Sequence, residues 1–174
     1  MNPQGTSKLR GGTARQGDWT MMRVSLKPTT ELLSTLREYV FEMSHHLLGD
    51  AAMGDRVALA FHELLEHSGR NSRDEVTVAS VEVSDIEGKS VISVKVTNRA
   101  GAQQAAALEQ TLAELRSTDE VAAYYQRALR AGTNDDSSAG FGLARVCAEG
   151  AMTLRSEIHG DFVTIVAEAR ETGK

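Results

Sequence analysis

Two β-hairpin patterns separated by stretches of helical periodicity are the feature that most restricts how this chain can fold. Residues 75–97 contain two runs rich in β-branched residues around a turn at 86–89, and residues 152–167 contain two more around 159–161. A further alternating run occupies residues 19–26. Hairpins mixed with helix pairs favour an α+β layered fold over a doubly wound sheet. We therefore expect a two-layer sandwich, with a mixed, mostly antiparallel sheet and helices on one face.

Helical periodicity predicts the remaining elements in four stretches: 30–48, 51–68, 103–131 and 140–149. The third should form two helices, because Ser117-Thr118-Asp119 interrupts it and provides a new helix start. Gly150 should end the last helix. Within 75–84 the apolar residues change phase between Val78 and Val81, which predicts a β-bulge in that strand.

The composition is that of a single globular domain. The chain has 174 residues, 41% of them hydrophobic and 25% charged, so a core of ordinary size can form. We assign the domain to 19–172, after a disordered basic tail over 1–18. The net charge of −5 argues against direct nucleic-acid binding. No apolar run approaches a membrane span and no signal-peptide core is present, so we expect a cytoplasmic protein without membrane contact.

The predicted helix at 51–68 carries a polar stripe beside its apolar face. With Val57 at the centre of the core face, the adjacent stripe holds Arg56, Ala60, Glu63, His67 and Asn71. Glu63 is a candidate general base, or a group that orients a hydroxyl for phosphoryl transfer. His67, one turn further, is a candidate phosphate or metal contact. An ordinary solvated helix face would carry the same pattern, so spacing alone leaves both interpretations open.

A second candidate segment is the polar loop 134–142, which leads into the last predicted helix. Gly140 and Gly142 allow a close approach of the backbone, and the N–H groups of the helix N-terminus attract anions. Ser137 and Ser138 add hydroxyl donors. A plain loop with a helix cap would have the same composition, so phosphate binding and simple capping both stay open.

The end of the central hairpin is a third candidate segment. Asn98 could hydrogen-bond a nucleotide base and Arg99 could contact a phosphate, with Gly101 in the turn that follows. A plain strand-to-helix turn with an asparagine cap explains the same residues, and this alternative also stays open.

These segments, their separation and the element order resemble the GHKL (Bergerat-fold) ATPases over about residues 20–170. The branch that looks most similar is that of the bacterial anti-sigma-factor serine/threonine kinases and SiaB-like regulators. In that family a Glu-x-x-x-Asn motif supplies the catalytic base and a magnesium ligand; here Glu63 matches the glutamate, and His67 stands in place of the asparagine. The adenine motif, Asp-x-Gly-x-Gly, corresponds to 98–102, where the aspartate and both glycines are replaced. The later glycine motif is kept at 140–143.

These departures weaken the nucleotide site that the resemblance implies. Magnesium prefers oxygen ligands, and His67 offers nitrogen. The neutral amide of Asn98 accepts less strongly from an adenine amino group than a carboxylate does. His67, and Asn71 on the same helix stripe, are our candidates for nucleotide binding on this helix. We therefore expect binding of ATP and magnesium to be weak or absent.

The resemblance implies a regulatory ATPase-fold protein of a bacterial partner-switching system. Its partner would be a small STAS-like antagonist protein or a sigma factor, and a homodimer is compatible with this role. The alternative is an active ATP- and magnesium-dependent serine/threonine kinase, in which Glu63 activates the substrate hydroxyl and the 134–142 loop covers the phosphates. A second alternative is a non-catalytic structural or sensory domain.

Overall fold

The computed structural model describes residues 19–73, 76–86, 89–116, 118–131 and 140–170. The elements follow the chain in this order: β1 (Trp19–Leu26), α1 (Thr30–Leu48), α2 (Ala51–Asn71), β2 (Thr77–Ile86), β3 (Lys89–Arg99), α3 (Ala102–Glu114), α4 (Thr118–Ala131), α5 (Phe141–Ala148), β4 (Thr153–His159) and β5 (Phe162–Arg170). Both predicted hairpins are present, and the stretch 103–131 forms two helices as expected.

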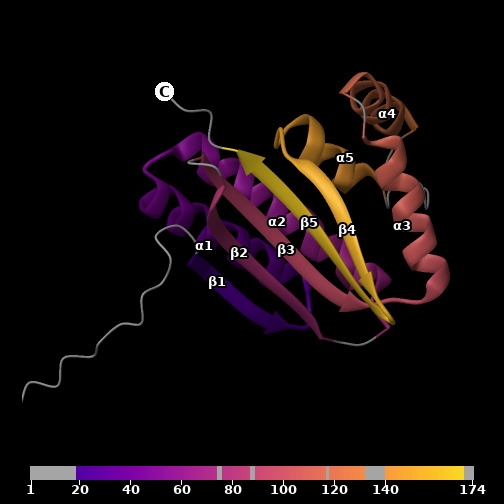
Figure 1. The fold of residues 1–174 in the computed structure, drawn as a ribbon, viewed down its shortest axis with the longest axis horizontal. Coiled ribbons are helices and arrows are strands. Elements are labelled where there is room, and N and C mark those ends of the chain that lie inside the picture. The colour runs from indigo at the N-terminus through magenta and orange to yellow at the C-terminus, as the bar shows by residue number, and fades with distance from the viewer. Residues whose placement is uncertain (1–18, 74–75, 87–88, 117, 132–139, 171–174) are drawn as a thin grey trace, which may run out of the picture.

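The strands form one five-stranded sheet in the order β1-β2-β3-β5-β4. Helices α1 and α2 lie behind this sheet in Figure 1, and α3, α4 and α5 lie toward its β4 side. The predicted α+β two-layer sandwich is therefore confirmed. One detail differs, because each of the four strand pairings is antiparallel and the described strands contain no parallel pair.

The predicted bulge lies in a different strand. The register between β2 and β3 continues without a break from Val78 to Ile86, whereas the pairing of β1 with β2 shifts between Thr20 and Met22. In β2, the core-facing residues alternate regularly, and Val78 belongs to the opposite face. The change of phase in the sequence therefore reflects apolar residues on both faces of β2 and not an extra residue.

Helix α2 is the centre of the core. Its predicted core face is fully buried: Val57, Phe61, Leu64 and Leu65 expose none of their surface. The helix packs on β2 and β3 and has α1 on one side and α5 on the other. Burial of each such side chain contributes about 1.5–3 kcal/mol to folding. Because both flanks of α2 are occupied by helices, the polar residues on these flanks must be accommodated at helix–helix contacts.

Candidate functional site

Glu63 lies at the contact between α2 and α5, where its side chain is only 8% exposed. Its Oε1 accepts a hydrogen bond of 2.8 Å from Nη1 of Arg145, which lies on α5. Nε of the same arginine donates to Oε2 of Glu149 at 3.1 Å. The other carboxylate oxygen of Glu63 lies against Gly142, in the space that a side chain at this position would need. Gly142 therefore lets the Glu63 carboxylate pack directly on the first turn of α5.

The protonation of Glu63 is controlled by two opposed effects. Burial raises the pKa of Glu63 above its usual range, and the positive charge of Arg145 offsets part of the rise. A raised pKa suits a general base, but a base must also reach the proton that it removes. The described contacts of this carboxylate are with the arginine and with Gly142.

The first half of the polar stripe on α2 also faces α5. Arg56 donates from Nε to the carbonyl oxygen of Gly150 at 2.5 Å and from Nη2 to that of Ala151 at 2.6 Å. Ala60, between Arg56 and Glu63 on the stripe, is fully buried. The stripe therefore contacts α5 through Arg145 and the segment that follows α5 through the carbonyl groups of Gly150 and Ala151.

Two tyrosines of α4 cover the beginning of α5. The ring of Tyr125 stacks on Phe141, with centroids 5.4 Å apart and planes inclined by 12°, and its hydroxyl donates to Glu149. The hydroxyl of Tyr124 occupies the space that a side chain at Gly140 would need. The glycines predicted to approach a phosphate thus lie close to Tyr124 and Glu63. Ser137 and Ser138 lie outside the described residues.

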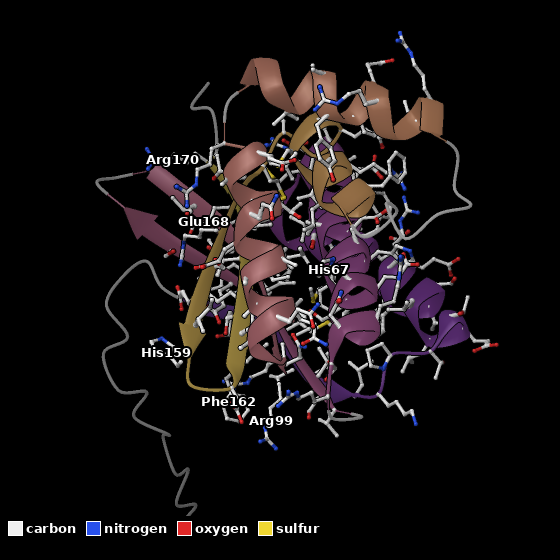
Figure 2. All side chains as sticks on the ribbon, turned by 90° about the vertical axis from the view of Figure 1, so that its right-hand side faces the viewer. His67, Arg99, His159, Phe162, Glu168 and Arg170 are labelled. Atoms are coloured by element: carbon white, nitrogen blue, oxygen red, sulfur yellow. The ribbon has the colours of Figure 1, made fainter. Side chains whose placement is uncertain are left out.

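The three candidates at the end of β3 and in the turn that follows have different surroundings. Asn98 is buried, and its Nδ2 donates to the carbonyl oxygen of Arg99 at 3.3 Å. The Arg99 side chain bonds Oδ2 of Asp161 at 3.0 Å and lies over the ring of Phe162. Figure 2 shows Arg99 and Phe162 together at the end of the sheet, away from His67 on α2. At Gly101, a Cβ atom would meet the end of the Gln104 side chain.

The last two candidates lie on the second half of α2. Nδ2 of Asn71 donates to the carbonyl oxygen of His67 at 2.8 Å, so the Asn71 side chain caps a carbonyl group in the last turn of the helix. Both residues are half-buried. Within the described part of the chain, no three His, Cys, Asp or Glu side chains gather where they could hold a metal ion.

A hollow of about 750 Å³ lies between α1 and α2 and was missed by the sequence analysis. Its lining is mixed: Ser34, Thr35, Arg37, Glu38, Tyr39, Phe41, Glu42, Asp55, Ala58 and His62. Tyr39, which is 58% exposed, is a large aromatic side chain on the rim. Tyr39 precedes Val40, which belongs to the apolar stripe of α1, and therefore lies on a different face of the helix. A large aromatic residue outside the apolar stripe was the sequence signal for this hollow.

The fold is similar to that of a chain in the crystal structure of the SiaB–SiaC complex from Pseudomonas aeruginosa. The TM-score is 0.55 at 13% sequence identity, over 87% of this chain and 91% of that chain. No family model matches this chain, and no curated protein matches it in sequence. The likeness supports the SiaB-like part of the expected resemblance at the level of the fold. Within the described residues, no helix has the length and apolar character to cross a membrane.

Proposed function

We propose that this chain is a regulatory protein that acts by binding another protein and not by transferring phosphate. The observation that carries this proposal is the partly buried ion pair between Glu63 and Arg145, because it engages the residue that was expected to act as the base. The carboxylate already accepts from the Arg145 guanidinium, and taking a proton from a substrate hydroxyl would disrupt this pair.

Other described residues also fit ATP and magnesium poorly. The spaces beside Gly101, Gly140 and Gly142 are taken by Gln104, Tyr124 and Glu63. These glycines would otherwise give a ligand access to the backbone. His67 supplies nitrogen where magnesium prefers oxygen. The proposal is therefore a regulator of the partner-switching type in which nucleotide binding is weak or lost.

The protein partner is proposed from the fold. The similar chain comes from a complex of SiaB with SiaC, so one protein structure with this fold contains a bound protein. By analogy, the partner of this chain would be a small STAS-like antagonist protein or a sigma factor in the cytoplasm. The hollow between α1 and α2, with the exposed Tyr39 on its rim, provides a surface for such contact.

Calorimetric titration with ATP and magnesium is expected to give no binding up to about millimolar nucleotide. We expect no binding because other side chains take up the space beside Gly101, Gly140 and Gly142. The alternative, an active kinase, predicts binding and transfer of the γ-phosphate to a protein hydroxyl. In that case Glu63→Ala would abolish transfer with little loss of nucleotide affinity, and our proposal would be wrong.

Titration with a purified STAS-like protein or sigma factor of the same cell is expected to give binding without nucleotide, with a Kd on the order of micromolar. Tyr39→Ala is expected to weaken this binding about tenfold or more, because exposed aromatic side chains often dominate interfaces. Leu129→Ala is a matched control, since Leu129 is a comparably exposed apolar side chain on the distant α4. If neither class of partner binds, the non-catalytic structural or sensory alternative replaces this proposal.

A further inference from the structure

Strand β4 is an edge of the sheet, and among the described strands it pairs with β5 alone. A two-residue turn joins β4 to β5, with His159 and Phe162 as the closing pair. In an antiparallel ladder, alternate residues direct their backbone groups to the neighbouring strand, and the others direct them to the free side. Counting from the turn, the backbone groups of Leu154, Ser156 and Ile158 face the free edge. A long open edge is a template for another strand.

The sequence of β4 is self-complementary about Ser156. Arg155 precedes this serine and Glu157 follows it, and the next residues outward are Leu154 and Ile158. In an antiparallel pair of two such strands centred on Ser156, each arginine lies opposite a glutamate. Each leucine likewise lies opposite an isoleucine. Opposite charges and apolar pairs across strands are favourable, and like charges are unfavourable. This register therefore places favourable side-chain pairs on both faces of the strand.

The charged side chains of β4 lie on the face of the sheet opposite the helices, where hydrogen bonds restrict their positions. Arg155 donates to Oε1 of Glu168 from Nε at 3.2 Å and from Nη2 at 3.0 Å, and it also bonds Glu157. Arg155 is 45% exposed and Glu157 is 43% exposed. Because their positions are already restricted, little additional conformational entropy is lost when a partner strand supplies further charges.

The apolar side chains of β4 lie on the face covered by helices, and their burial is incomplete. Leu154 packs against the edge of the core, whereas Ile158 is 38% exposed. Beside Leu154 is a pocket of about 420 Å³ with a mainly apolar lining: Leu115, Arg116, Val121, Cys147, Ala151, Met152, Thr153 and Leu154. In the register centred on Ser156, Ile158 of a second chain lies next to Leu154 and therefore at this pocket.

We propose that β4 pairs antiparallel with β4 of a second copy of this chain, with a two-fold axis at Ser156. The two five-stranded sheets then become one continuous sheet. The interface is isologous, so that Arg155 of each copy contacts Glu157 of the other. Helix α3 contacts β4, so it lies near the proposed interface. This inference does not depend on the proposed function.

Charge reversal tests the register. The wild-type chain should sediment as a dimer at about 100 µM, with twice the 18.8 kDa chain mass. Arg155→Glu and Glu157→Arg should each raise the dimer Kd about tenfold or more, because each places two like-charged pairs across the axis. An equimolar mixture of the two variants should regain the dimer, since every facing pair is then of opposite charge. Lys95→Glu is the matched control, in the same row of the sheet but two strands away.

A disulfide tests the same register independently of charge. In a Cys147→Ser background, Ser156→Cys should form a linked dimer under mild oxidation, because residues facing across the axis have Cα atoms about 5.5 Å apart. Thr153→Cys should not, since the two copies of this exposed residue would be about 20 Å apart. A monomeric wild-type chain, failure of the mixed variants to dimerise, or equal cross-linking at both positions would overturn the proposal.

Discussion

Replacement of Arg145 by alanine is expected to lower the free energy of unfolding by about 3 kcal/mol. The substitution leaves the Glu63 carboxylate, which is 8% exposed, without its guanidinium partner at the α2–α5 contact. Loss of one member of a buried ion pair is more harmful than loss of both, because the remaining charge is buried without compensation. The value lies at the lower end of the usual range because Arg145 is itself 30% exposed. Urea unfolding followed by circular dichroism would measure it.

Two further variants separate charge from packing. Glu63→Gln keeps the shape and an oxygen acceptor for Arg145, and it should cost only about 1 kcal/mol. Adding Glu63→Gln to Arg145→Ala should recover part of the lost stability, because no buried charge then remains. If the double variant is as unstable as the sum of the two single variants, the ion pair is not the source of the effect.

The effect of Arg145→Ala should also depend on pH. Burial raises the pKa of Glu63 in the folded protein above its ordinary value of 4.5. Between 4.5 and the raised pKa, the folded state binds more protons than the unfolded state, so ionisation of Glu63 reduces stability as the pH rises through this window. Without Arg145 the pKa rises further. The deficit of the variant should therefore be smaller near pH 5 than near pH 8, and a deficit independent of pH would contradict this account.

Replacement of Gly54 by leucine is expected to cost about 2–3 kcal/mol of stability. Gly54 lies on α2 where this helix meets α1, and a Cβ atom there would be 3.2 Å from the backbone nitrogen of His45 and 3.3 Å from the carbonyl oxygen of Phe41. A leucine side chain would push the backbone of α1 away from α2. Because the two helices also form the 750 Å³ hollow, binding of a protein partner there should fall as well.

The controls for Gly54→Leu use the same helix. Ala52→Leu adds a large side chain to α2 at an exposed position and should change stability by less than about 0.5 kcal/mol. Gly54→Ala combines a gain of about 1 kcal/mol in helix propensity with a tight contact, so its net effect should be small. A large loss in Ala52→Leu would show that the effect is not specific to the α1–α2 contact.

The helices and strands could be predicted because their signals lie in residues close together in the sequence. The core face of α2 followed from spacing alone, since Phe61, Leu64 and Leu65 recur at helical intervals and are fully buried. The surroundings of Glu63 were not predictable in the same way. Its partner Arg145 is 82 positions away, and helical spacing does not reveal whether a polar stripe faces a ligand or another helix. The bulge was misplaced for a related reason, because strand register depends on the neighbouring strand.

The strand order also has a consequence for how the chain reaches its native state. Strand β3 at the centre of the sheet pairs with β5, and Thr97 meets Thr164 across 67 positions of sequence. Closing so long a loop is entropically costly and slows folding relative to local hairpin formation. During synthesis, β1, β2, β3, α1 and α2 leave the ribosome before β5 exists. The unpaired side of β3 is therefore exposed to wrong strand partners until the last hairpin arrives.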